Sequence, residues 1–152
     1  MSTVLALSRP TEWNFPLFVH VLGAMILVGG LLTGASVLAF ARGDARFLRL
    51  GYWTLLAVAL PGWIVMFVGA NWIYSKEGWD DVDDEPAWLG LGWTIAMIGA
   101  VLVLIALILG GIGVRRLRTG GGAGLLKAAM VIAWIVLAAA LVAVWAMAGK
   151  PD

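Results

Sequence analysis

One side chain of this sequence is well suited to chemistry. His20 is the only histidine, and imidazole gains or loses a proton near neutral pH. It lies in a long stretch without charged residues, from 13 to 41. If such a stretch crosses a membrane, an ionisable residue in it is a functional candidate by default. Three roles are open: a hydrogen bond to a neighbouring helix, with Asn71 as the first candidate partner; a ligand to a metal or haem iron; or a contact for a proton or small molecule.

Haem b or copper would each need more than this histidine. Haem iron accepts His, Met, Cys or Tyr, and a chain with one histidine and no cysteine points to methionine as the second ligand. Imidazole with a thioether also suits Cu(I), and a homodimer would bring two copies of His20 together. The side chains expected to form a pocket with His20 and Asn71 are Met66, Met97, Trp72 and Trp93, with Met147 as a further thioether.

A second polar feature is the acidic segment 76–86. Its carboxylates could offer oxygen ligands to Ca²⁺ or Mg²⁺, but it lacks the Gly and Glu placement of an EF-hand loop. The alternatives are a solvated loop outside the lipid and a docking surface for a basic partner. The acidic residues concerned are Asp80, Asp81, Asp83, Asp84 and Glu85.

Catalytic groupings are missing from the sequence pattern. Hydrolysis would need a serine or threonine near His20 and an orienting acid, and the charge-free stretches contain no acid. The lack of cysteine excludes thiolate metal sites and cysteine nucleophiles. The glycine-rich segment 120–124 does not continue into the Lys-Ser/Thr of a phosphate loop. The sequence favours a binding or accessory protein over an enzyme.

The elements that must position these residues follow from composition. Of the 152 residues, 62% are hydrophobic and 12% charged, whereas soluble domains carry about 25% charged residues. A soluble monomer and a nucleic-acid binder are therefore excluded. Four stretches carry no charge: 13–41, 50–75, 86–114 and 128–149.

Each stretch is long enough to cross a bilayer. About 20 apolar residues span the hydrocarbon core as a helix, and only helices and closed barrels satisfy the backbone there. The apolar runs lack the alternation of a barrel strand. The sequence predicts an all-α integral membrane four-helix bundle, a single domain over 1–152, with helices at about 15–40, 52–74, 88–114 and 125–148.

Charge asymmetry predicts the orientation. Most of the ten Lys and Arg residues lie in the two connections 42–49 and 115–127, and most acids lie on the other side. Because cytoplasmic loops are enriched in Lys and Arg, both termini are expected outside (N-out/C-out), with short basic cytoplasmic loops and one acidic outer loop. Tryptophans cluster near the outer boundary, where rings anchor in the headgroups. The expected location is the inner (plasma) membrane of a cell, as a multi-pass protein.

Small residues indicate how the helices pack. Gly23 and Gly30 in the first helix, and Gly62 and Gly69 in the second, share a seven-residue spacing. Small residues let membrane helices approach closely. We expect packing within one chain, with a homodimer seam as the alternative. Pro61 before Gly62 predicts a kink in the second helix.

The string Phe18-Val-His20-Val-Leu-Gly23-Ala-Met-Ile-Leu-Val-Gly29-Gly30 resembles the opening of the DUF2269-like predicted integral membrane proteins. More distantly, it is similar to the histidine-bearing helices of the copper-resistance protein D group. The resemblance implies a four-helix membrane architecture and directs attention to His20.

Three functions fit this pattern. The first is an accessory or interaction subunit of a membrane complex, whose partners are the lipid bilayer and another membrane protein or a second copy. The second is a haem- or copper-binding membrane protein using His20 in an outer-leaflet pocket. The third is a component of a transporter or channel.

Overall fold

The computed structural model describes residues 11–81 and 86–149, which are helical apart from short turns. The long helices are α2 (Asn14–Phe40), α3 (Ala45–Thr54), α4 (Leu60–Lys76), α5 (Ala87–Arg116) and α6 (Ala123–Gly149). A π-helical segment, η2 (Leu55–Ala59), joins α3 to α4. The 3-10 turns are η1 (Thr11–Trp13), η3 (Trp79–Asp81) and η4 (Leu117–Thr119).

Four helical stretches within the described residues are long and apolar enough to cross a membrane: Thr11–Phe40, Ala45–Lys76, Ala87–Thr119 and Ala123–Gly149. At 1.5 Å per residue, each exceeds the roughly 30 Å hydrocarbon core. Large apolar side chains are exposed on all four, and the described residues include no buried polar side chain. The predicted all-α class with four membrane-spanning helices is confirmed at this level, and the chain is a multi-pass membrane protein.

The second helical stretch begins at Ala45 rather than near 52. Asp44 caps it, since its Oδ1 accepts a hydrogen bond of 2.7 Å from the backbone N–H of Arg46. An N-cap carboxylate satisfies an otherwise unpaired amide, so the helix starts well before its apolar span. Leu48 and Gly51 on this first part are buried, and its arginines are exposed.

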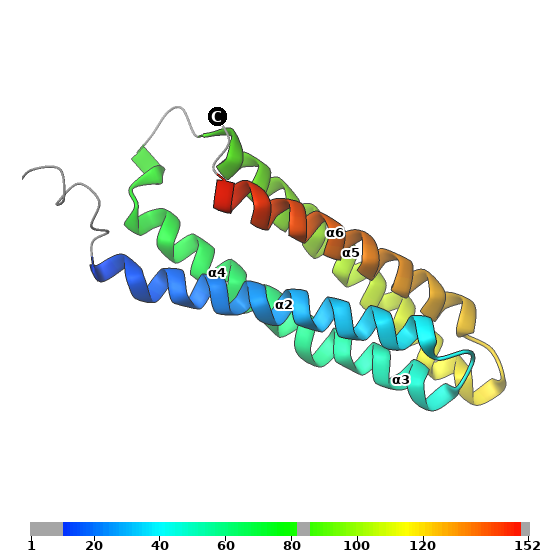
Figure 1. Cartoon of the computed structure of the whole chain (residues 1–152). Coiled ribbons are helices and arrows are strands. Elements are labelled where there is room, and N and C mark those ends of the chain that lie inside the picture. The colour runs from blue at the N-terminus through cyan, green and yellow to red at the C-terminus, as the bar shows by residue number, and fades with distance from the viewer. Residues whose placement is uncertain (1–10, 82–85, 150–152) are drawn as a thin grey trace, which may run out of the picture.

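The helices form two hairpins (Figure 1). One pairs α2 with α3 and α4, and the other pairs α5 with α6, while α2 also contacts α6. The hairpins lie close together at one end of the bundle and diverge toward the other.

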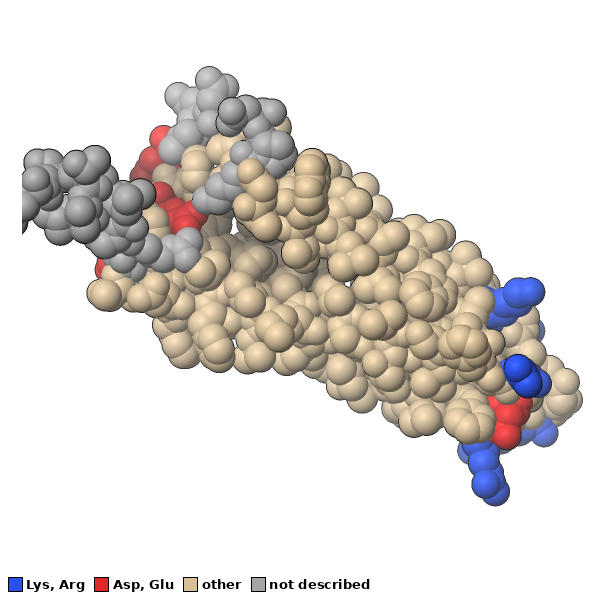
Figure 2. Space-filling view, in the orientation of Figure 1, with Lys and Arg blue, Asp and Glu red and all other residues tan. Residues whose placement is uncertain are grey.

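Charge distinguishes the two ends (Figure 2). We call the end where the hairpins meet the basic end and the opposite end the open end. The basic end carries Arg42, Arg46, Arg49, Arg115, Arg116, Arg118 and Lys127 together with the N-cap residue Asp44; the open end carries Glu12, Lys76, Glu77 and Asp81.

Glycines bring the backbones of α2 and α4 into contact. A Cβ added at Gly30 would stand 2.7 Å from the backbone nitrogen of Ala59, and one at Gly62 would stand 2.5 Å from that of Leu27. At Gly23 and Gly69 it would overlap the backbones of Met66 and His20. The glycines with seven-residue spacing therefore each pack against the backbone of the other helical stretch, so the close packing lies within one chain, as expected from the sequence.

Where the sequence predicts a kink at Pro61, the structure has a π-helical segment just before the proline. The backbone N–H of Leu60 donates to the carbonyl of Leu55, five residues back. Proline has no N–H and its ring crowds the preceding turn, and a π turn accommodates both. Before this segment α3 contacts α5 and α6, whereas beyond it α4 has few contacts with α5. The π segment therefore lies where the second helix leaves the other hairpin.

The packed core belongs to the half nearer the basic end. Leu31, Ala35, Leu55, Leu107 and Leu126 are among its buried members. The space found among Leu31, Leu55 and Leu107 measures about 10 Å³, too small for a ligand. This tight half holds the hairpins together, and the other half is hollow.

Candidate functional site

A cavity of about 580 Å³ lies between the hairpins toward the open end. Residues of α2, α4, α5 and α6 line it, and Leu27, Gly99 and Val136 form its floor where it meets the core. The surface is hollowed in this region (Figure 2). The volume falls within the roughly 300–1,000 Å³ of small-molecule sites. The cavity is therefore the candidate functional site.

Aromatic rings close the gap between α4 and α5. Trp63 stacks on Phe67 with centroids 4.9 Å apart, and Phe67 meets Trp93 edge to face at 5.5 Å. Tyr74 contacts Trp93 at 5.8 Å. The indole N–H of Trp63 donates to the carbonyl of Ala96 at 3.3 Å, which ties α4 to α5. We call Trp63, Phe67, Tyr74 and Trp93 the aromatic wall.

A second set of contacts forms the rim of the cavity at the open end. The hydroxyl of Tyr74 donates to the carbonyl of Trp79 at 3.4 Å. The indole N–H of Trp79 donates to Glu77 at 2.8 Å, and its ring meets that of Trp88 edge to face at 6.1 Å. These contacts hold η3 beside the start of α5.

His20 lines the cavity and is half-buried. Its Nδ1 lies 3.0 Å from the backbone carbonyl of Met66 on α4. A carbonyl oxygen only accepts, so Nδ1 carries the proton and donates. In the neutral ring Nε2 then holds a lone pair. The close approach of Gly69 to the backbone of His20 makes this interhelical bond possible.

Asn71 is not the partner of His20. It is exposed, and its amide donates 2.9 Å to the carbonyl of Phe67 in its own helix. The expected hydrogen bond between His20 and Asn71 is therefore replaced by two separate ones. The contact between α2 and α4 sets His20 level with Met66 and Gly69, and Asn71 lies on another face.

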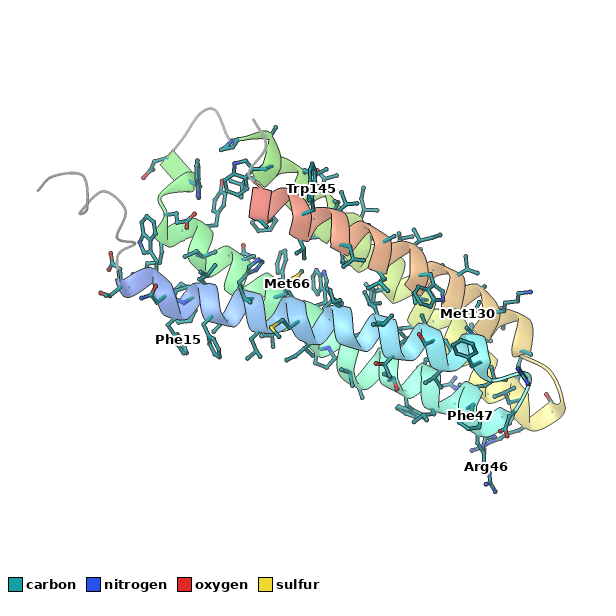
Figure 3. All side chains as sticks on the ribbon, viewed as in Figure 1. Phe15, Arg46, Phe47, Met66, Met130 and Trp145 are labelled. Atoms are coloured by element: carbon teal, nitrogen blue, oxygen red, sulfur yellow. The ribbon has the colours of Figure 1, made fainter. Side chains whose placement is uncertain are left out.

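Of the side chains expected around His20, Met66, Trp93 and Met147 line the cavity. Figure 3 shows Met66 in the gap between α2 and α6. The terminal methyl group of Met147 packs against Gly92.

Two expected pocket residues lie elsewhere. Met97 is 53% exposed, and Trp72 is 42% exposed with its ring 5.6 Å from that of Phe15. Neither lines the cavity. Both face outward because the rotation of their helices, which composition does not reveal, is set by packing.

Trp63, Phe67 and Tyr74 also line the cavity and were not expected there from the sequence. A signal existed, because positions four and eleven residues after Trp63 fall close to its own face of a helix. That stripe of rings, set beside Trp93, could have indicated an aromatic wall.

The acidic segment is only partly described. Asp80 and Asp81 end η3, with Asp81 exposed, and Asp83, Asp84 and Glu85 lie outside the described residues. Across 11–81 and 86–149, no three His, Cys, Asp or Glu side chains gather as a metal site would require. Calcium or magnesium binding by this segment stays a prediction.

No protein-family model, curated protein or solved structure matches this chain. The resemblance of the first helix to the DUF2269-like proteins and the copper-resistance protein D group therefore stays an expectation.

Proposed function

We propose that this chain is a membrane protein that binds a lipid-soluble small molecule in the cavity between its hairpins. The observation that carries the proposal is the 580 Å³ space in a bundle whose other half is tightly packed. If the helices associated only to stabilise the fold, closing this gap would make the free energy of association more favourable, because each lining atom would gain van der Waals contacts. A gap kept open by helix geometry suits a ligand.

The lining indicates the polarity of the ligand. Apolar and aromatic side chains make up most of it, with His20 and the rim groups as the polar exceptions. Ligand sites of this kind bury an apolar body and orient it through a few polar contacts. A lipid-soluble molecule fits this description, and the bilayer supplies such molecules to the protein directly.

We also propose that the open end faces the outside of the cell. The arginines of the basic end would then lie in the cytosol, in accordance with the charge bias of cytoplasmic loops. The cavity would occupy the outer half of the plasma membrane, with His20 about 9 Å along the axis from the start of α2.

A pair of tryptophan substitutions on α6 tests ligand binding. Ala140 lines the cavity, whereas Ala138 is exposed and does not. Ala140→Trp fills the space, and Ala138→Trp adds the same side chain on another face. Wild-type protein and both variants are photolabelled with a diazirine-bearing alkane, and the labelled peptides are mapped by mass spectrometry.

Labelling near Met66 and Trp93 should persist in Ala138→Trp and be lost in Ala140→Trp. Exposed Ile108, which lies outside the cavity, should be labelled equally in all three proteins as the internal reference. Unchanged labelling of Met66 and Trp93 in Ala140→Trp would contradict the proposal.

Haem or copper is a second candidate occupant, because His20, Met66 and Met147 all line this one cavity. Imidazole and thioether are ligands that both haem iron and Cu(I) accept. A visible spectrum and metal analysis of the purified protein test this candidate. A Soret band or stoichiometric copper that disappears in His20→Ala would support it, and a colourless, metal-free protein would remove it. The roles as an accessory subunit or transporter component stay predictions.

A further inference from the structure

His20 sets a chemical requirement on whatever binds beside it. Its Nδ1–H is directed to the carbonyl of Met66, so the neutral ring offers Nε2 as an acceptor only. The indole N–H groups of Trp63 and Trp79 already donate, to Ala96 and Glu77. A ligand group beside Nε2 must therefore be a hydrogen-bond donor.

The surroundings of His20 favour an aromatic ligand. The carbonyl that His20 bonds belongs to Met66, which lies within one helical turn of both Trp63 and Phe67. Offset-stacked and edge-to-face ring pairs are favoured at centroid separations of about 4.5–7 Å. His20 and all four residues of the aromatic wall line the same cavity, so one bound ring can engage both.

The mouth of the cavity opens where the bilayer would be. Val21 and Met25 on α2, and Leu141 and Val144 on α6, line the cavity and are also exposed. These residues lie on α2 and α6, which diverge toward the open end (Figure 1). An apolar gap at this depth lets a long hydrocarbon tail extend into the lipid while the head lies inside.

We infer that the ligand is a lipid-soluble phenol or quinol, whose ring packs on the aromatic wall and whose hydroxyl donates a hydrogen bond to Nε2 of His20. The inference rests on the proposed function and specifies the chemical class of its ligand. An alkane or a carbonyl-only lipid would leave Nε2 without a donor, at the cost of an unsatisfied polar atom.

Two probes that differ in one bond test the hydroxyl. 4-Decylphenol and its methyl ether, 4-decylanisole, share ring and tail, and only the phenol donates. Dissociation constants are measured by tryptophan fluorescence for wild-type protein and for His20→Phe, which keeps a ring but has no acceptor. The ratio of the two constants is then compared between proteins, so that partitioning into detergent cancels.

The preference for the phenol should be about tenfold greater in wild type than in His20→Phe, as expected for one buried hydrogen bond. His20→Gln keeps an acceptor oxygen and should retain part of the preference. Asn71→Ala, at an exposed position outside the cavity, should match wild type. Equal ratios in wild type and His20→Phe would overturn the inference.

The single histidine allows a test without any variant. In protein labelled with ¹⁵N-histidine, the ring nitrogens of His20 are the only imidazole signals, because the chain has no other histidine. Adding 4-decylphenol should move the Nε2 signal in the direction of an accepted hydrogen bond, and 4-decylanisole should not. An Nε2 signal unaffected by saturating phenol would overturn the inference even if His20→Phe does not fold.

The two proposals fail in different ways. If both probes bind the wild type no better than they bind Ala140→Trp, the cavity is not a binding site and the proposed function fails. If both bind the wild type better than Ala140→Trp but with the same ratio in His20→Phe, the cavity binds apolar molecules and only the phenol inference fails.

Discussion

At the scale of single residues, the state of His20 is determined by a backbone atom. The carbonyl of Met66 accepts from Nδ1, and no substitution of the Met66 side chain removes that oxygen. The tautomer is therefore fixed by how α2 packs against α4. A hydrogen bond that fixes one ring nitrogen also decides what the other can bind.

The first prediction concerns this tautomer. In the ligand-free protein the neutral ring of His20 should be protonated at Nδ1, the nitrogen that donates to Met66. The ¹⁵N chemical shifts of the two ring nitrogens distinguish the tautomers directly. Protonation at Nε2 would mean that the interhelical hydrogen bond is absent.

A second prediction concerns the tie between the hairpins at Trp63. Trp63→Phe keeps a ring against Phe67 but removes the N–H that donates to Ala96. Loss of this bond should lower the free energy of unfolding by about 1 kcal/mol. Trp145→Phe, at the 66% exposed position labelled in Figure 3, is the matched control and should change it little. Reversible unfolding in detergent measures the free energy of unfolding of both variants. Equal changes in the two would contradict a stabilising hydrogen bond between Trp63 and Ala96.

At the scale of elements, two features together create the cavity: the close packing of α2 against α4, and the π-helical segment η2. Glycines draw the two backbones together along the seam. The π segment lies where the second helix turns from α5 and α6. The result is one tightly paired hairpin that parts from its neighbour, and the cavity is the space this leaves.

A third prediction compares two glycines of α2. A Cβ at Gly23 would overlap the backbone of Met66, whereas one at Gly29 would meet nothing within 4 Å. Gly23→Ala should destabilise the protein by about 2 kcal/mol through overpacking. Gly29→Ala should be neutral or stabilising by less than about 1 kcal/mol, because alanine favours helix. Thermal unfolding in one detergent compares the variants, and similar effects would disprove the close seam.

At the scale of the whole molecule, most basic residues lie at one end of an apolar body and most of the described acidic residues at the other, with Asp44 and Lys76 as the exceptions (Figure 2). The tight core lies near the basic end and the hollow near the open end. With the proposed orientation, the tight half would lie toward the cytosol and the cavity would be reached from the outer half of the bilayer.

The fourth prediction tests that orientation. Since the chain has no cysteine, a single introduced cysteine is labelled without background. Asp81→Cys at the exposed open end should react with a membrane-impermeant maleimide in intact cells. Arg116→Cys at the basic end should react only after the membrane is permeabilised. The reverse labelling pattern would show the opposite orientation, with the cavity in the cytoplasmic half of the bilayer.

The amino-acid sequence by itself determined the class of the protein. Charge-free stretches long enough to cross a bilayer predicted the four membrane helices, because no charged residue is easily placed in hydrocarbon. The spacing of Gly23 with Gly30, and of Gly62 with Gly69, predicted close helix pairing. Glycine has no side chain, so its positions in the sequence show directly where two backbones can approach each other. Pro61 predicted a kink, and a π-helical segment lies just before it.

Only the tertiary structure decided which side chains form the site. In a soluble protein polar residues mark the outer face of a helix, but here the lipid and the core are equally apolar, so the pattern gives no inward face. Met66 and Met97 therefore looked alike in the sequence, although only Met66 lines the cavity. The hydrogen-bond partner of His20 could not be predicted from the sequence either. It is a backbone carbonyl, a group that every residue carries, and only the packing of α2 against α4 brings the carbonyl of Met66 within reach.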